Sequence, residues 1–273
     1  MIFELEKTSF TKIKKISYEG IQYPEVQSII DLNNPGWIFV DNLNNPQTSL
    51  VWNKGIGGFY LLGNPENEIF INELSDYIDC VIAPRAKMQG LNSFEVSATT
   101  EEWNQQIEKI FQKRNLFNWE QQTHIWNFSN ALPICEEIDN IKYFEINTTL
   151  LNDENIVNMT FLYDKITSFW GDINSFFEKG GYGHCAVKDN KIASVCFTGF
   201  IAGDIHCIDI ETFIEFRCKG IGYSLACKLI KSLVDDCKKP YWDCTKSNIS
   251  SMQLARKLGF CKTCEYVCYG FDL

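Results

Sequence analysis

The sequence predicts a protein of two parts, an α/β part followed by an α+β part, and three observations support this prediction. Short runs with alternating apolar residues, typical of strands, are followed along the chain by amphipathic helical patterns, as in proteins whose sheets are covered by helices. The 273 residues are 45% hydrophobic and 14% aromatic, which is enough for two separate cores. In the second half, a strand pattern leads through two glycines into a helical pattern. We therefore expect an α/β N-terminal domain at residues 1–135 and a second domain at residues 136–273.

Turn residues separate the expected elements of the first half. The run 33–36, Asn-Asn-Pro-Gly, stops a helix, and Pro84 ends a short apolar run that we interpret as a strand. Thr99 or Thr100 caps the next helix, and Glu102 favours Thr99 because it completes a capping box. The aromatic-rich residues 116–130 are expected to pack between a strand and a helix. The expected helices are 23–32, 64–79 and one that follows the threonines, and the expected strands are 37–40, 49–52, 58–62, 80–83, 93–97 and 141–146.

Apolar residues spaced four apart predict the helices of the second half. Ile221, Leu225 and Leu229 share one face of the helix that follows the two glycines. The tail at 260–273 alternates enough to predict a closing β-hairpin. The expected helices are 154–178, 221–237 and 248–258, and the expected strands are 184–187, 192–199, 206–212 and 240–244.

The junction between the strand at 206–212 and the helix at 221–237 is the clearest candidate for a ligand site. It reads Arg-Cys-Lys-Gly-Ile-Gly from Arg217 to Gly222. Glycine lets the backbone approach a ligand closely, and the first amides of a helix have no partner within it. Because the helix dipole is positive at that end, the junction is suited to a phosphate or pyrophosphate.

The same four letters, Lys-Gly-Ile-Gly, occur at residues 54–57 as well as 219–222. A strand pattern, without a helical stripe, follows the earlier copy. With no helix start there are no converging amides, so the sequence predicts a simple turn at 54–57.

The later junction and the segment that follows it resemble the GNAT superfamily of N-acetyltransferases. The pattern Arg-x-x-Gly-x-Gly at 217–222 is similar to the pyrophosphate loop of that superfamily, and the run from Asn248 to Phe260 is similar to its closing helix. Thr212 and the run 242–244, Trp-Asp-Cys, also resemble a narrower, two-part GNAT acetyltransferase family that includes the zwittermicin A resistance protein.

This resemblance implies a GNAT-like fold in the second half, with a mixed, mainly antiparallel sheet flanked by helices. The first half would be a degenerate copy of that fold or another α/β domain, lining the acceptor pocket. The resemblance also implies an enzyme, an acyltransferase that moves the acetyl group of acetyl-CoA to an amine of an amino acid, polyamine or antibiotic. A non-catalytic module that binds acyl-CoA is the alternative.

Position by position, the resemblance assigns Ile210, Glu211 and Thr212 to the pantetheine and the thioester. It assigns the loop to the pyrophosphate, and the loop residues are Arg217, Cys218, Lys219, Gly220, Ile221 and Gly222. Asn248 is expected at the cofactor arm or, equally, as the N-cap of the closing helix. Some lysines could meet the remaining phosphate, although a solvated helix face is the simpler interpretation of each. These lysines are Lys219, Lys228, Lys231, Lys246 and Lys257.

The strand at 206–212 carries the candidate general bases Glu211, which we prefer, His206 and Asp209. Strand alternation places Glu211 and His206 on opposite faces, so they cannot both point into one pocket. A plain surface carboxylate is the alternative interpretation of Glu211. Many superfamily members carry a tyrosine, which protonates the leaving thiolate, where this chain has Ala255. Either another group does this here, with Tyr266 and Tyr269 near in sequence, or the thiolate leaves unassisted.

Composition limits the classes of partner. The net charge of −10 argues against a nucleic acid or an anionic membrane and is compatible with a cationic amine. The N-terminus lacks the pattern of a secretory signal, and no apolar run is long enough to span a bilayer, so we expect a cytoplasmic protein. The 12 cysteines are expected to be reduced, and the partial metal spacing at 261–268 lacks a second pair, so no metal is expected. The sequence gives no signal for the acceptor or for the oligomeric state.

Overall fold

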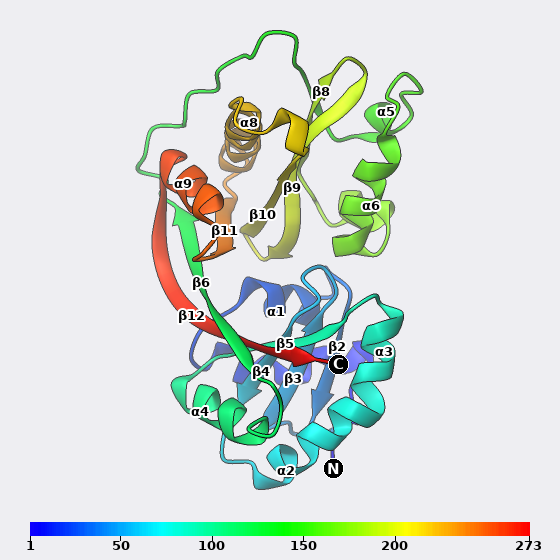
Figure 1. Ribbon diagram of the computed structural model, residues 1–273, viewed down its shortest axis with the longest axis vertical. Coiled ribbons are helices and arrows are strands. Elements are labelled where there is room, and N and C mark those ends of the chain that lie inside the picture. Colours follow the sequence, from blue (N-terminus) through cyan, green and yellow to red (C-terminus); the bar gives the residue numbers. More distant parts are fainter. The chain divides into compact units, whose positions relative to one another are not determined.

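A computed structural model describes residues 1–273 of the protein, which form two compact units (Figure 1). Unit 1 contains Met1–Gln121 and Glu265–Leu273, and unit 2 contains Gln122–Cys264. The division therefore lies before the boundary expected at residue 135, and the last residues of the chain belong to the first unit.

Unit 1 is a sheet with the strand order β1-β2-β3-β4-β5-β12 and helices between its strands. Neighbouring strands are antiparallel except for β4 and β5, which are parallel. Its strands are β1 (Phe3–Glu4), β2 (Gly36–Val40), β3 (Thr48–Asn53), β4 (Phe59–Gly63), β5 (Ser93–Ala98) and the end of β12 (Phe260–Asp272). Its helices are two short 3-10 segments (Lys7–Ile13 and Ile16–Tyr18), α1 (Pro24–Ile30), α2 (Glu68–Tyr77), a π-helical turn (Ile78–Ile82), α3 (Ala83–Met88) and α4 (Glu101–Ile110).

The segment between β4 and β5 is helical, so the strand expected at 80–83 is wrong. The π-helical turn joins α2 to α3, and Pro84 lies in the first turn of α3. Ile78 and Ile82 are four residues apart and both fully buried, which makes the apolar run one face of a helix. Pro84 has no N–H to donate, and its helix directly follows the π-helical turn, where the regular α-helical bonding pattern is already interrupted.

Two local predictions in unit 1 had different outcomes. Thr100, not Thr99, is the N-cap of α4, and its Oγ1 accepts a hydrogen bond from the Trp103 amide at 3.4 Å. Residues 54–57 form the turn between β3 and β4, as predicted, and the amide of Gly57 donates to the carbonyl of Lys54 at 3.2 Å.

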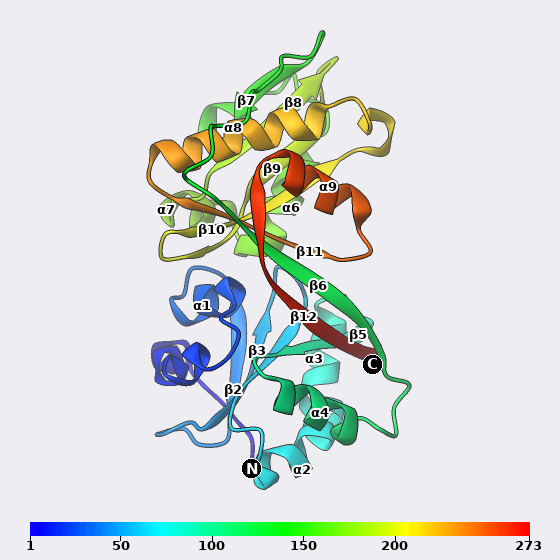
Figure 2. The same ribbon diagram turned by 90° about the vertical axis from the view of Figure 1, so that its left-hand side faces the viewer.

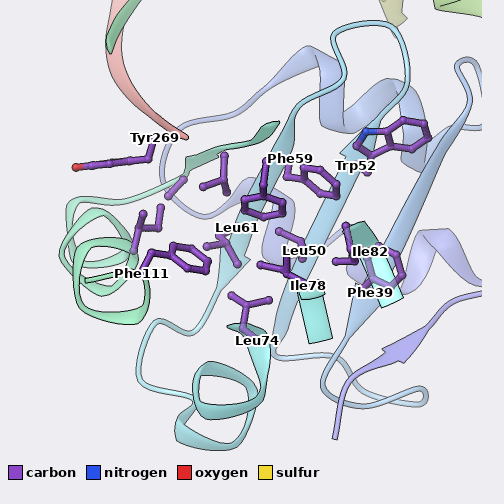
Figure 3. Packing of buried hydrophobic residues seen from close by; sticks show 14 of the residues in the cluster. Phe39, Leu50, Trp52, Phe59, Leu61, Leu74, Ile78, Ile82, Phe111 and Tyr269 are labelled. Carbon is purple, nitrogen blue, oxygen red and sulfur yellow. The ribbon is translucent and has the colours of Figure 1, made fainter. Parts of the chain in front are cut away.

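One of the cores of unit 1 lies between its sheet and the helices α2 and α4 (Figure 3). Phe39, Leu50 and Leu61 project from the strands and are fully buried. Leu74 and Phe111 cover them from the helical side, again without exposure. The apolar side chains of the alternating strands and those of the amphipathic helices therefore face each other in this core.

Unit 2 contains the strand order β6-β11-β10-β9-β8-β7. Strands β7 to β10 are antiparallel neighbours, whereas β10 and β11 are parallel. Its strands are the end of β6 (Phe117–Trp126), β7 (Lys142–Glu145), β8 (Gly183–Lys188), β9 (Lys191–Ala202), β10 (Ile205–Thr212), β11 (Lys239–Thr245) and the start of β12. Its helices are α5 (Thr148–Leu151), α6 (Met159–Trp170), α7 (Ile173–Glu178), a 3-10 segment (Ile214–Phe216), α8 (Ile221–Asp235) and α9 (Ile249–Lys257).

Helices cover both faces of the unit 2 sheet. Helix α8 packs on one face of β8 to β10, and α6 and α7 pack on the other (Figure 2). The single helix expected at 154–178 is two helices, because Gly171 ends α6 with a φ of 83°. No helix combines the length and the apolar content that crossing a membrane requires.

The hairpin expected at 260–273 is instead one long strand, β12. It begins in unit 2 and ends in unit 1, where Cys268 faces Ser97 in an antiparallel pair with β5. Apolar and polar residues alternate through the segment. Its one glycine, Gly270, lies near the end, so no turn residue in the middle allows the chain to form a hairpin.

Strand β10 separates from β11 before it ends. The parallel pairing covers Ile205 to Cys207 only, although β10 continues to Thr212. At the same place a β-bulge shifts the register with β9, where Cys207 faces Phe200 and Ile208 faces Thr198. From Ile208 onward, one edge of β10 is therefore not paired with β11, which is the geometry on which the site depends.

Candidate active site

A cavity of about 520 Å³ lies in unit 2 where β10, α8, β11 and α9 meet. The end of β10 contributes Ile210, Glu211 and Thr212. The loop after it contributes Phe216, Arg217, Cys218, Gly220, Ile221 and Gly222, but not Lys219. Trp242 of β11 and the first turns of α9 form the other side. The cavity thus occupies the space that opens where β10 and β11 part.

The start of α8 presents free backbone donors to this cavity. The backbone N–H groups from Cys218 to Tyr223 donate no hydrogen bond to the protein, and the first helical bond runs from Ser224 to the Gly220 carbonyl at 3.0 Å. Cys218 and Gly220 have φ values of 58° and 78°, and left-handed residues at alternate positions turn successive amides toward one concave side. Such an arrangement at a helix start is suited to an anion.

Hydrogen bonds fix the end of β10 beside these amides. Arg217 donates from Nε to the Thr212 carbonyl at 2.9 Å, while its terminal nitrogens have no protein partner. Ser194 of β9 donates from Oγ to the Glu211 carbonyl at 2.9 Å and contacts Thr212 Oγ1 at 2.8 Å. A Cβ atom at Gly222 would lie 3.3 Å from Thr212 Oγ1, so any side chain there would fill the gap between α8 and β10.

The start of α9 forms the opposite wall. Asn248 is the N-cap of this helix, and its Oδ1 accepts from the Ser251 amide at 3.1 Å. Trp242 donates from Nε1 to Ser251 Oγ at 2.9 Å. Asn248 therefore both caps α9 and lines the cavity, which joins the two interpretations that the sequence left open.

Glu211 lies at the cavity with its side chain 39% exposed. Lys165 of α6 places its Nζ 2.7 Å from Glu211 Oε2 and 3.7 Å from Asp209 Oδ2. Burial raises the pKa of Asp209, and Lys165 offsets only part of that rise. Glu211 is thus one of two carboxylates that share a lysine on the α6 face of the sheet.

His206 does not line the cavity, and the structure places it on the other face of β10 from Glu211, as alternation predicts. It is 2% exposed, with Nδ1 3.5 Å from Thr198 Oγ1 and its ring against that of Tyr182. Burial first, and the nearby Lys238 second, lower its pKa to about 4. The sequence proposal of His206 as a base at this site is therefore not supported by its position.

The expected basic cluster divides in the structure. Lys228 and Lys231 line a separate hollow of about 320 Å³, and the Lys219 ammonium bonds the Glu215 carbonyl at 2.7 Å. Lys257 lies 4.1 Å above the ring of Tyr223, which itself lines the cavity. Lys257 is therefore the member of the cluster that borders the cavity through Tyr223.

Ala255 is fully buried in the core beneath α8 and α9 and has no group to donate. The cysteines are free thiols, and no cluster of His, Cys, Asp and Glu side chains is arranged to hold a metal ion.

Sequence reasoning missed several lining residues and the lysine of the acid pair. Ser251 and Leu254 lie on the helix that the motif identified, so its helical spacing could have indicated them. Lys165 is far from the motif along the chain and carries no local signal. The further lining residues that were missed are Phe216, Tyr223, Trp242 and Ser250.

Comparison with known proteins agrees with this architecture. A family model described as GNAT acetyltransferase matches residues 17–269. A curated protein of Bacillus subtilis (strain 168), named uncharacterized N-acetyltransferase YdfB, is 22% identical over 272 residues, and the match covers 97% of each chain.

Two solved structures share the fold over nearly the whole chain. A GCN5-related N-acetyltransferase-like protein from Streptococcus suis superposes with a TM-score of 0.71 at 17% identity, over 96% of this chain and 99% of that one. A tandem GNAT protein from the clavulanic acid biosynthesis pathway gives a TM-score of 0.65 at 8% identity, over 100% and 98% of the two chains. The second likeness agrees with the two-part arrangement seen here.

Proposed function

Because this chain belongs to the GNAT acetyltransferase family, whose model spans nearly all of it, we propose that unit 2 binds acetyl-CoA and acetylates a small-molecule amine. One observation carries the proposal, namely the free amides of Cys218 to Tyr223 that open on the cavity. A volume of about 520 Å³ lies in the range of ligand sites.

The cofactor pyrophosphate would bind at the start of α8. The free amides, the positive end of the helix dipole and the terminal nitrogens of Arg217 all favour negative charge there. Gly222 keeps the approach open, because it has no side chain to fill the gap toward Thr212.

The acetyl-pantetheine arm would run along the free edge of β10. The backbone groups from Ile208 to Thr212 that face away from β9 are not paired with β11, so they can bond the amides of the arm. A backbone N–H on this edge would stabilise the oxyanion of the tetrahedral intermediate. Holding thioester and amine together supplies roughly 7–11 kcal/mol of the barrier.

We assign Glu211 as the general base that accepts the proton of the acceptor amine. An amine attacks a thioester only in its neutral form, so a carboxylate at the cavity can take the proton as the bond forms. The new C–N bond forms, the C–S bond breaks, and coenzyme A departs as a thiolate. Ala255 has no proton to give, and we assign no other residue to this step, because a thiolate is a good leaving group even without a proton.

Calorimetric titration with acetyl-CoA, followed by a labelled-acetyl transfer screen over amino acids, polyamines and amine antibiotics, tests this proposal. Glu211→Gln should lower kcat by about 10²–10⁴-fold and leave the affinity for acetyl-CoA unchanged. Glu215→Gln is the matched control, since Glu215 lies on the loop after β10, pairs with Lys191 of β9 and does not line the cavity. Acetyl-CoA binding without transfer would favour the non-catalytic module, and no binding would exclude both readings.

A further inference from the structure

Lys165 is the charged side chain that links helix α6 to the acid pair of β10. Its ammonium lies 2.7 Å from Glu211 Oε2 and 3.7 Å from Asp209 Oδ2, and its side chain is 26% exposed. It also lies 6.0 Å from the centre of the Phe169 ring, one turn further along α6. The contact is therefore held from the helix and is not a loose surface pair.

The acid pair needs such a cation. Asp209 and Glu211 are two residues apart on β10, so their side chains lie on the same face and repel each other when both are ionised. Burial lowers the pKa of Lys165, but Asp209 and Glu211 outweigh burial and the pKa lies above its ordinary value. Lys165 thus stays protonated at neutral pH, and the trio carries a formal charge of −1.

We propose that Lys165 is a positioning and specificity residue, which holds Glu211 for proton transfer and weakens the attraction of the site for multiply charged amines. The inference depends on the proposed function, because it concerns the residue assigned there as the base.

Two consequences follow from the geometry. The pair between Lys165 and Oε2 holds the carboxylate from one side, and Oε1 is the oxygen left to accept a proton from the acceptor. The Lys165 ammonium also offsets one of the two carboxylates, so an acceptor cation meets about half of the negative charge that the pair alone would present. Both effects disappear together if the lysine is replaced by an uncharged side chain of similar length.

Lys165→Met tests the inference in the full chain, with acetyl-CoA and spermidine, which is a multiply charged amine, and with the best acceptor from the screen. We expect kcat to fall by about tenfold or more, because Glu211 loses the contact that fixes the orientation of its carboxylate. The KM for spermidine should fall rather than rise, since the site gains net negative charge. Lys165→Arg should restore both values, and calorimetric affinity for acetyl-CoA should match the wild type in every variant.

Lys231→Met is the matched control, because Lys231 forms a 2.7 Å pair with Asp235 on α8 away from the cavity. The inference is overturned if Lys165→Met has the kcat of the wild type, or if its KM for spermidine rises and Lys165→Arg does not restore it. The proposed function stands in either case. Loss of acetyl-CoA binding in Lys165→Met would also overturn it, as the lysine would then be structural. A wild-type protein that transfers acetyl to no amine contradicts the proposed function itself, and the inference is rejected with it.

Discussion

The two units share a succession of elements but differ at the equivalent helix start. In unit 1, antiparallel strands β2 to β4 lead into α2 and α3, the parallel strand β5 and then α4. In unit 2, β8 to β10 lead into α8, the parallel strand β11 and then α9. A cavity with free amides lies after β10, whereas the junction after β4 is occupied by the protein's own side chains.

The helix starts differ in their caps. Asn67 caps α2, with Oδ1 accepting from the Phe70 amide at 3.2 Å, and Glu68 adds negative charge in the first turn. Helix α8 has Gly220 as its N-cap, no capping side chain and no acidic residue in its first turn. A capping side chain and a bound anion accept hydrogen bonds from the same backbone N–H groups at a helix start. In α2 the Asn67 side chain already takes one of these bonds, whereas in α8 no side chain does.

The second difference lies on the next helix. Trp103 is the third residue after the N-cap of α4, is fully buried and donates from Nε1 to the Gly63 carbonyl at 2.8 Å. The residue in the same place after the N-cap of α9 is Ser251, which lines the cavity. At the same helical position, unit 1 has a buried indole that bonds the end of β4, whereas unit 2 has a serine at the cavity wall. We infer that the shared order of elements is not enough to make the site.

The largest expected effect comes from removing the indole. Trp103→Ala should destabilise unit 1 by about 3–5 kcal/mol, because it leaves a cavity and the Gly63 carbonyl without its donor. Native-state hydrogen exchange of the β4 amides measures this loss, with Trp103→Phe as a milder control. Affinity for acetyl-CoA should not rise through a second site, since Asn67 still caps α2; two binding events per chain would contradict the comparison.

The next effect concerns the open junction. Gly222→Glu should weaken acetyl-CoA binding by about 100-fold or more, because the new carboxylate enters the gap beside Thr212 and repels the phosphates. Gln253→Glu, which adds the same charge at an exposed position on α9, should bind like the wild type. Calorimetry measures both, and retained affinity in Gly222→Glu would remove the loop from the site.

The smallest expected effect comes from filling the cavity of unit 2 with a larger side chain. Ser251→Trp should place in unit 2 the side chain that closes unit 1, and weaken acetyl-CoA binding by about tenfold or more through lost volume. Gln253→Trp is the control, because the same indole there points to solvent on α9. Equal affinity of the two variants would show that the identity of this residue does not decide which unit binds.

Local hydrophobic patterns predicted most helices and strands. The predictions failed where one pattern was compatible with both a helix and a strand, or with two capping residues. The apolar run at 80–83 fits a strand or a buried helix equally well, and the burial of Ile78 and Ile82 decides for the helix. Thr99 completed a capping box in the sequence, but the backbone places Thr100 at the cap. The division between the units falls inside β6, before the boundary expected at residue 135, and β12 returns the last residues to unit 1.

The sequence by itself determined the helix start after Arg217 and the turn at 54–57, although both contain Lys-Gly-Ile-Gly. Glycine positions, the helical stripe and the cap of α9 are effects of near neighbours, so the residues that follow each copy already distinguish them. Only the tertiary structure decided that Trp103 closes one junction, that Ser251 leaves the other open, and that Lys165 joins the acid pair. These contacts join residues far apart along the chain, and long-range packing, which no local pattern encodes, brings them together.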